Sequence, residues 1–589
     1  MVKEGDTLPP NDKTTGANVE TLYNTTPEIN IDIRNSQFTM LNTTKSGMIE
    51  FYKVIDWVYS EIDSFKNKQE DSSRKVDTLE AIGIEYPYPF MTADAQKAAA
   101  RTYDYIVVGG GTAGCPLAAT LSQHYSVLVL ERGDSPYGNP DVETFKGFSK
   151  VFGDPKDYPY VMEGFVSEDG VQLARGRVLG GGSAINAGFY SRASSEYIQK
   201  MKWDEKLVNE SYEWVEKLNA FRQYKLFPWN TAVKGGLLDA GVLPYNGYTL
   251  EHLEGTKIGA STFDYNGKRH SAADLLQYAN PENIVVLLNA TASRILFNLA
   301  SGDLKVNGVE FMSTSDGMHY QVSLDKFSIN SEVILSAGTI GSPQLLLLSG
   351  IGPTQELKKM NITTILDLPF VGKKVQDNPM VKFLVESPKP LEFAQVQVVG
   401  ILDNSQLYIE SASFLQQNNM TKIQYLGLVA SKVAFPSSRG ELWLKSKDPQ
   451  DNPYVRYNYY SHPSDLKKCM LCAKVMVNLS LSSFIQEFAF TKNGQKELQF
   501  RGAKLPKGQS NDDALAKFCK DSLGTYYHYH GGCEVGLVVD KRHRVQGVPN
   551  LRVVDNSIFK YSPGTNPQAT TMMLGRYMGI HILQECMNL

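Results

Sequence analysis

The sequence lacks long apolar runs and any strong excess of charge. No stretch of about 18 or more apolar residues occurs in its 589 residues, so no transmembrane helix is predicted. The N-terminal MVKEGDTLPPNDKTTG is polar and has no apolar signal-peptide core, which leaves the compartment open. A net charge of −4 gives no reason to expect nucleic acid or an anionic membrane as a partner.

Cysteine is scarce, and its spacing gives little support to metal or redox chemistry. The chain has six cysteines, of which Cys469 and Cys472 form a C-x-x-C. Neither a second C-x-x-C nor a histidine pair at zinc spacing follows. The pattern favours two positions on one helix, one of which can enter a disulfide, and we expect no metal site.

The length of the chain predicts two or more structural units. Residues 1–100 are polar and contain one amphipathic piece, GMIEFYKVIDWVYSEIDSF. Its apolar side chains recur at helical spacing: Met48, Phe51, Ile55, Val58 and Ile62. We expect a polar N-terminal extension with one helix, either packed on the main body or loosely attached to it.

A βαβ unit is predicted where the organised part of the chain begins. The apolar run Tyr105–Val108 is typical of a buried parallel strand. Three glycines in the pattern G-x-G-x-x-G follow it, at Gly109, Gly111 and Gly114. A helix of small residues comes next, and then a second strand, SVLVLE, that ends at Glu131.

Each part of this unit suits a dinucleotide. Gly109 permits a tight turn, Gly111 lets the backbone approach a diphosphate, and Gly114 lets helix and strand pack closely. The helix N-terminus, with its free N–H groups and dipole, favours the anionic diphosphate. Glu131 can accept hydrogen bonds from ribose hydroxyls. The combination predicts dinucleotide binding rather than a structural glycine turn, but it does not distinguish FAD from NAD.

Further elements are predicted along the chain. Strands are expected in NIVVLLNATASRILF and SEVILSAG, and a helix at SPQLLLLSGIG. Residues 380–520 have shorter apolar segments and more polar turns, as expected of a domain that covers a substrate.

Five segments together resemble one enzyme family, the glucose–methanol–choline (GMC) oxidoreductases. They are ARGRVLGGGSAINAGFYSRA, SAGTIGSPQLLLLSGIGP, VGKKVQDNP, HYHGGCEVG and LRVVDNSIFKYSPGTNPQATTMMLGRYMG. The similarity covers about residues 101–589 in the correct order, although Lys374 and Asn378 depart from the usual residues. The residues in these segments are most similar to those of the plant branch, which contains mandelonitrile (hydroxynitrile) lyases and HOTHEAD-like proteins.

The resemblance implies non-covalent FAD, since Ile185 stands where members that tether the cofactor often carry histidine. It implies an α/β fold with a Rossmann-like FAD-binding domain and a second α+β substrate domain built on an antiparallel sheet. After the extension, the expected parts are FAD-binding 101–190, substrate and cap 191–269, FAD-binding 270–380, substrate 381–520 and a C-terminal active-site part 521–589.

The expected cofactor contacts combine the glycine motif with the family segments. They are Gly109, Gly111, Thr112, Ala113, Gly114, Glu131, Arg132, Arg177, Gly181, Gly182, Asn186, Ala292, Asp555, Asn556, Asn566, Pro567 and Gln568.

The catalytic residues are expected in YYHYHGG and at the Asn-Pro step. The resemblance places the catalytic histidine at His528, which has a side chain suited to proton transfer near neutral pH. In an extended chain Tyr526 and His530 would share its face, and His530 is expected to orient or support it. Asn566 takes the position of the second polar group, where its amide can donate a hydrogen bond and cannot become cationic.

Two functions from different classes remain open, together with a non-catalytic FAD-binding protein. The first is an alcohol oxidase or dehydrogenase, in which His528 accepts the hydroxyl proton while a hydride leaves the carbinol carbon. The second is a hydroxynitrile lyase. The related lyases carry histidine where this chain has Asn566, so we favour the oxidoreductase. The resemblance suggests long-chain hydroxy acids, aromatic alcohols or cyanohydrins as small-molecule substrates, and it leaves the oligomeric state open.

The resemblance to secreted plant lyases also implies a disulfide between Cys469 and Cys519. Glycosylation would accompany such an export route, and seven N-x-S/T sequons are present: Asn24, Asn42, Asn209, Asn289, Asn361, Asn419 and Asn478.

Overall fold

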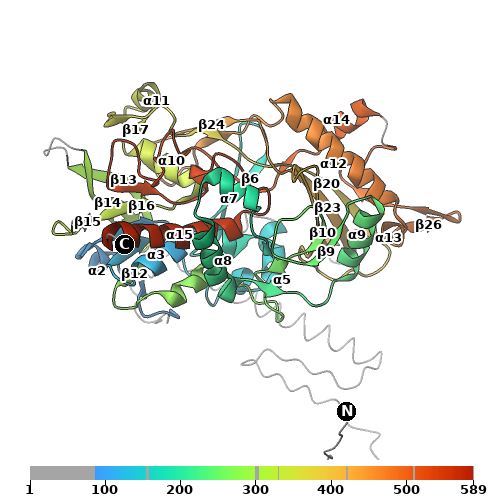
Figure 1. The fold of residues 1–589 in the computed structure, drawn as a ribbon, viewed down its shortest axis with the longest axis horizontal. Helices are drawn as coiled ribbons and strands as arrows, with labels where there is room; N and C mark the ends of the chain where they lie inside the picture. Colours follow the sequence, from blue (N-terminus) through green and yellow to red (C-terminus); the bar gives the residue numbers. More distant parts are fainter. Residues whose placement is uncertain are drawn as a thin grey trace, which may run out of the picture. The chain divides into compact units, whose positions relative to one another are not determined.

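The chain separates into residues 1–85 and residues 86–589, and the computed structural model describes the second unit (Figure 1). The description covers residues 86–587 with short gaps at 154–157, 299–303, 329, 419–421 and 509–510. The amphipathic helix predicted at residues 48–62 lies outside the described residues.

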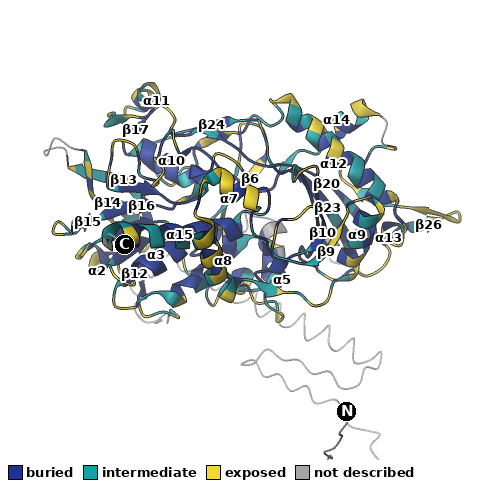
Figure 2. Cartoon of the chain, viewed as in Figure 1, coloured by how far each residue is buried: buried dark blue, intermediate teal, exposed yellow. Residues whose placement is uncertain are grey.

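A parallel sheet of six strands carries the predicted βαβ unit. Its strands, in spatial order, are β1 (Met91–Thr92), β12 (Ile284–Leu287), β4 (Val127–Leu130), β3 (Tyr105–Val108), β16 (Glu332–Leu335) and β30 (Leu551–Val553). Every neighbouring pair is parallel. The strands are rich in Val, Ile and Leu and almost wholly buried (Figure 2), as expected when helices or loops cover both faces. The sheet therefore joins stretches that are far apart in the sequence.

Helix α15 (Gln568–Met587) packs on the helix of the glycine motif, α3 (Gly114–Leu121), and on α8 (Glu205–Asn219). Glycine makes the close contact with α3 possible. A Cβ atom at Gly575 would lie 2.2 Å from the carbonyl oxygen of Ala113. The C-terminal helix is thus fixed against the start of the dinucleotide unit.

A second, mostly antiparallel sheet lies beside the first. Its strands, in order, are β28 (Gln499–Arg501), β20 (Pro379–Ser387), β23 (Lys422–Val433), β22 (Leu407–Asn418), β21 (Val398–Leu402), β10 (Gly255–Ile258) and β9 (Tyr245–Tyr248), with β29 (Gly524–Thr525) paired to β20. Helices α9 (Pro228–Asp239) and α12 (Pro463–Leu481) pack against it. The two sheets confirm the predicted fold class, whereas the exact domain boundaries stay a prediction.

Alternation along β20 gives the second sheet two different faces. Val381 and Phe383 join a hydrophobic core with Trp229 of α9 and Met476 of α12. Met380 and Lys382 line a cavity instead. Since successive side chains of a strand point to opposite faces, helices cover one face of the sheet and the cavity lies on the other.

The C-x-x-C lies on one helix, as predicted, because α12 contains both Cys469 and Cys472. Cys469 forms a disulfide with Cys519 of α14 (Asp512–Asp521), which confirms the pairing that the resemblance implied. Cys472 is a buried free thiol.

Two further segments form the predicted kinds of element. NIVVLLNATASRILF, where strands were expected, forms two of them, β12 and β13 (Ala290–Asn298). Helix α10 (Gly338–Leu348) begins before the predicted SPQLLLLSGIG and holds Pro343 inside it. Its start is fixed from a distance, because the Gly338 amide donates to the carboxylate of Asp555 at 2.9 Å.

Candidate active site

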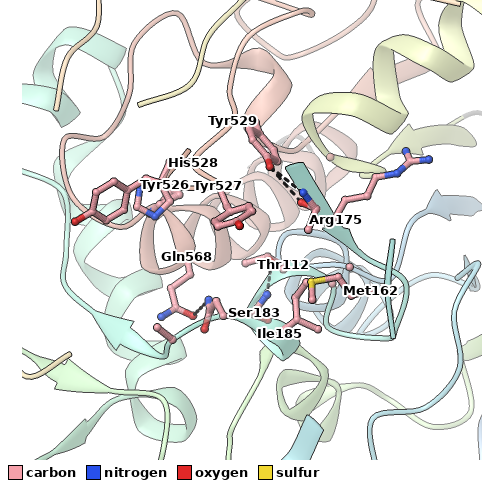
Figure 3. A pocket seen from close by; sticks show the side chains of 18 of the residues that line it. Thr112, Met162, Arg175, Ser183, Ile185, Tyr526, Tyr527, His528, Tyr529 and Gln568 are labelled. Atoms are coloured by element: carbon pink, nitrogen blue, oxygen red, sulfur yellow. Dashed lines mark hydrogen bonds between the residues drawn. The ribbon is translucent and has the colours of Figure 1, made fainter. Parts of the chain in front are cut away.

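A cavity of about 1040 Å³ is lined by residues of both sheets and of the loops between them. One end meets the glycine motif, and the other meets the loop after β29 (Figure 3). Among the described residues, no group of three or more His, Cys, Asp or Glu side chains is arranged to hold a metal ion. No described helix is both long and apolar enough to cross a membrane.

The glycine end of the cavity has the shape of a cofactor cradle. A Cβ atom at Gly111 would have no neighbour closer than 3.8 Å, and one at Gly182 none closer than 3.9 Å, so bare backbone faces open space. Gly114 acts differently. There a Cβ atom would lie 1.9 Å from the Gly109 carbonyl oxygen, which explains why α3 can approach the turn only with glycine.

Helices α3, α10 and α15 are among those that begin at the cavity. Gly111 precedes α3, Gly338 opens α10 and Pro567 precedes α15, and all three residues line the wall. Free N–H groups and the dipole make each helix start favourable for negative charge. Their convergence suits an anionic cofactor with a diphosphate and a flavin ring.

Polar groups at this end fit the same cofactor. Glu131 ends β4, and its carboxylate accepts hydrogen bonds from the Gly110 amide at 2.9 Å and the Gly133 amide at 2.8 Å. Burial raises the pKa of Glu131. Arg175 lines the wall and pairs with Glu163 at 3.1 Å, while its Nη2 is buried without a partner among the described residues. Such an unsatisfied donor fits a polar group of a bound cofactor.

Asp555 organises the chain rather than presenting free oxygens. It accepts the Gly338 amide at 2.9 Å, the Ser342 hydroxyl at 2.5 Å and the Ser557 amide at 2.8 Å. Burial raises its pKa. The carboxylate therefore fixes α10 and the turn that contains Asn556, whose Oδ1 accepts the Thr571 hydroxyl at 2.6 Å.

Asn186 and Gln568 both line the cavity, and Gln568 is labelled in Figure 3. The Asn186 amide donates to Gln568 Oε1 at 2.9 Å, and Gln568 Nε2 donates to the Phe189 carbonyl at 2.7 Å. Buried Arg269 donates to Asn186 Oδ1 at 3.2 Å. These bonds orient two amides at the start of α15.

The segment that carries His528 is not a regular strand, because Tyr527 has a left-handed backbone with φ of 59°. Asp377 nevertheless fixes the segment by accepting the His528 amide at 3.1 Å and the Thr525 hydroxyl at 2.5 Å. The rings of Tyr526 and His528 lie next to each other (Figure 3). Their centroids are 5.3 Å apart. Both residues line the cavity.

Lys432 of β23 contacts His528 from behind. Its Nζ lies 3.0 Å from His528 Nδ1 and donates to the Thr565 carbonyl at 2.9 Å. Burial, with the charge of Lys432 as a second cause, lowers the pKa of His528 well below its usual value. The imidazole is therefore neutral near pH 7 and able to accept a proton.

Asn566 is oriented by two residues of β22. The Tyr408 hydroxyl donates to Asn566 Oδ1 at 2.8 Å, and Asn566 Nδ2 donates to Glu410 Oε2 at 3.3 Å. One N–H of the amide therefore stays available to the cavity. Burial raises the pKa of Glu410 to about 7.

His530 lies behind the wall instead of lining it. Its backbone pairs with Gln376, and its Nδ1 lies 3.1 Å from the His528 carbonyl oxygen. Burial lowers its pKa to about 4. This placement suits a residue that supports the His528 segment.

The structure brings most of the predicted site residues together. Those that line the cavity are Gly109, Gly111, Thr112, Ala113, Glu131, Arg132, Gly181, Gly182, Asn186, Ala292, Tyr526, His528, Asp555, Asn556, Asn566, Pro567 and Gln568. Gly114, Arg177 and His530 do not line it. Their roles stay predictions, as do those of the lining residues.

Sequence reasoning missed Arg175, Tyr408, Glu410 and Lys432. A signal for the last two was present, because a charged residue interrupts the apolar alternation of each strand. Gln424, Leu426, Leu428 and Ala430 line the cavity at every second position, and Lys432 continues that series.

The fold and the cavity define a dinucleotide-dependent enzyme with a separate substrate face, and comparison with known proteins specifies the family. Residues 103–380 and 436–575 match the two family models of GMC oxidoreductases. The chain therefore belongs to the GMC oxidoreductase family, and its cofactor is FAD.

Plant relatives are similar over most of their length. An (R)-mandelonitrile lyase-like protein of Arabidopsis thaliana is 46% identical, with 82% of this chain and 90% of the relative covered. Protein HOTHEAD of the same plant is 42% identical, with 82% and 88% covered. The sinalpyl alcohol oxidase Nec3 of Nesocodon mauritianus is 44% identical, with 82% and 89% covered.

A solved structure shares the fold. Formate oxidase of Aspergillus oryzae superposes with a TM-score of 0.69 at 20% identity, covering 82% of this chain and 98% of the oxidase.

Proposed function

We propose that this protein is an FAD-dependent alcohol oxidase or dehydrogenase that binds FAD without a covalent link. The observation that carries the proposal is the pairing of a neutral His528 with an oriented Asn566 amide on one cavity wall. Lys432 joins their segments, since its Nζ contacts both His528 and the carbonyl of Thr565, next to Asn566. These two groups are the ones that removal of a hydroxyl proton requires.

Asn566 and His528 have different roles in the proposed reaction. Asn566 donates its free N–H to the substrate oxygen and holds it as negative charge develops, because Glu410 and Tyr408 fix the amide in the donating orientation. His528 Nε2, which has no hydrogen-bond partner among the described residues, accepts the hydroxyl proton. Bound FAD supplies the acceptor for the hydride that leaves the carbinol carbon.

The cavity wall favours an alcohol with an apolar body. Strands β20, β22 and β23 contribute apolar side chains to it at every second position: Met380, Leu384, Ala412, Phe414, Leu426, Leu428 and Ala430. Burying such a body on this face is favourable at about 25 cal/mol per Å² of apolar surface. Lys382 and Arg501 also line the wall and add polar contacts.

Hydroxynitrile cleavage is the second candidate, and the buried lysine beside His528 favours it. In its protonated form this lysine would place a positive charge near the site, and that charge would stabilise a departing cyanide. We rank it below oxidation, because the second polar group is the neutral Asn566 amide, which cannot protonate a leaving group.

One experiment separates the two functions. Purified protein is mixed without oxygen with a panel of alcohols of increasing apolar size, and the loss of flavin absorbance is followed. Cyanide release from mandelonitrile is measured in parallel, with His528→Ala as the control in both assays. We expect bleaching by at least one alcohol and little cyanide release. Rapid cleavage while the flavin stays oxidised would favour the lyase, and failure of both would favour an FAD-binding protein without catalysis.

A further inference from the structure

Lys432 is an unusual neighbour for a catalytic histidine. Its side chain is 1% exposed, and its Nζ lies 4.8 Å from the ring centroid of Tyr408 and 5.4 Å from that of Tyr526. No ion pair within the part of the chain that the structure describes includes it. Its two polar contacts are His528 Nδ1 at 3.0 Å and the Thr565 carbonyl at 2.9 Å.

The surroundings weaken the charge of this lysine. Burial lowers the pKa of Lys432 to about 7, although Glu410 and Asp377 act in the opposite direction. The free amine is therefore present at neutral pH. The titratable or charged groups that face it come from five parts of the fold: Tyr408 and Glu410 of β22, Tyr526 and His528 of the loop after β29, Asp377 after β19 (Lys373–Val375), His252 before β10 and Cys472 of α12.

The protonation of Lys432 decides which nitrogen of His528 is free. An ammonium can only donate, so it requires a bare Nδ1 and leaves the imidazole proton on Nε2, where the ring cannot act as a base. A free amine can donate one hydrogen to Thr565 and accept the Nδ1–H with its lone pair. Nε2 is then bare and faces the substrate side.

We propose that Lys432 is the second acceptor in a proton relay: the substrate hydroxyl proton goes to His528 Nε2 and the Nδ1 proton goes to Lys432 Nζ. The inference rests on the proposed function for the source of the proton. The O–H bond breaks as the Nε2–H bond forms, and the Nδ1–H bond breaks as the Nζ–H bond forms. The hydride leaves the carbinol carbon with its electron pair for the flavin. The alcohol thus loses one proton to the relay and one hydride to the flavin, and a carbonyl compound remains. The positive charge ends on Lys432, near Glu410, instead of on the imidazole.

Two substitutions of Lys432 distinguish the relay from a role in which only its positive charge assists the reaction. Lys432→Met removes the acceptor and should lower kcat/KM by about 10–100-fold, part of the effect of a general base. Lys432→Arg keeps a permanent cation that cannot accept a proton, so it should lock the proton on Nε2 and approach the loss seen with His528→Ala. More activity in Lys432→Arg than in Lys432→Met would show an electrostatic role and overturn the relay.

The pH profile gives a second test. In the parent protein kcat/KM should rise with pH through a limb near 7, because the free amine is the active form. In Lys432→Met the limb should move to lower pH, since burial keeps the pKa of His528 low. Lys257→Met is the matched control. Lys257 is equally buried and burial lowers its pKa to about 7, but its Nζ contacts the Ser191 hydroxyl and the Glu251 carbonyl instead of His528, so its loss should leave the limb in place.

The tautomer of His528 can be read without turnover and without any Lys432 variant. Nitrogen NMR of imidazole-labelled holoprotein, assigned with His528→Gln, distinguishes protonated from bare ring nitrogens. We expect a bare Nε2 above the limb and a bare Nδ1 below it. A bare Nδ1 on both sides would overturn the relay even if alcohols bleach the flavin. If the bare nitrogen of His528 changes with pH as expected but no alcohol bleaches the flavin, the relay would hold for another substrate and the oxidase proposal would be wrong.

Discussion

At the scale of single residues, His528 and His530 should respond differently to substitution. His528→Ala should leave FAD bound and lower turnover by about 10²–10⁴-fold, the usual contribution of a general base. His530→Ala should cost less, since that ring lies behind the wall and contacts the His528 carbonyl. Rates of flavin bleaching, normalised to bound FAD, measure both. A larger loss at His530 would place the base two residues further along the chain.

Asn566 gives the sharpest prediction for the substrate oxygen. Asn566→Asp should lower kcat/KM by about 10²–10³-fold, because it replaces a donor by a carboxylate beside Glu410. Asn566→His should retain part of the alcohol oxidation and gain weak cyanohydrin cleavage. Steady-state rates with one alcohol and with mandelonitrile measure both effects. An Asn566→Asp variant as active as the parent would exclude a donor role.

The sequence predicts residues well where a motif fixes their chemistry and poorly where strand register does. Gly111 and His528 stand in local patterns that can be recognised without a structure. Lys432 stands in no such pattern. Its place beside His528 depends on the pairing of β22 with β23, which puts Tyr408 opposite Lys432. Register is set by packing over the whole sheet, which no local pattern contains.

At the scale of elements, the disulfide should stabilise the helical face of the substrate sheet. It joins α12 to α14 across 50 residues, so the chain-entropy model gives about 4 kcal/mol. Cys519→Ser should lower the melting temperature while FAD stays bound, because the bond lies on the face away from the cavity. Cys472→Ser on the same helix is the matched control and should cost less. Equal melting temperatures for Cys519→Ser and the parent would contradict this prediction.

Substitutions in the glycine turn should cause two different defects, one in folding and one in FAD binding. Gly114→Ala should destabilise the fold, since its Cβ atom would meet the Gly109 carbonyl at 1.9 Å. Gly111→Ala should fold but bind FAD more weakly, because its methyl group would extend into the open cradle. Melting curves of the FAD-free proteins and FAD titrations separate these outcomes. A stable Gly114→Ala variant would mean that α3 can move away from the turn.

Elements are predictable where their boundaries are local. Strands β3 and β4 follow from continuous apolar runs, and α3 follows from small residues after the glycines. The start of α10 does not, because Gly338 and Pro343 are typical helix breakers. Asp555, more than two hundred residues later, accepts the Gly338 amide and supports the helix there.

At the scale of the whole molecule, FAD should be released by acid. Ile185 lines the cavity where family members that bind FAD covalently are expected to carry histidine. Acid precipitation should therefore release the FAD and leave a colourless protein pellet. Free FAD at 100 times its Kd should then raise the stability of the refolded protein by about 2.7 kcal/mol. Absorbance of the supernatant and melting curves with and without FAD test this. Colour retained in the pellet would indicate a covalent bond.

The arrangement of the two sheets follows from the family resemblance rather than from periodicity. Apolar runs alone indicate buried strands, but they do not say that the strand after Asn550 lies beside β16. The size of the cavity and its apolar wall likewise depend on packing between segments that are distant in the chain, so no local pattern predicts them.

The six-stranded sheet has a consequence for the order of biosynthesis. Its edge strand β30 leaves the ribosome long after β3 and β4, and α15, which supplies part of the cavity wall, follows it. At 5–20 residues per second the delay between β3 and β30 is roughly 20–90 s. A nascent chain therefore exposes an incomplete cradle until β30 and the start of α15 have been made, and we expect the cofactor to bind only after that point.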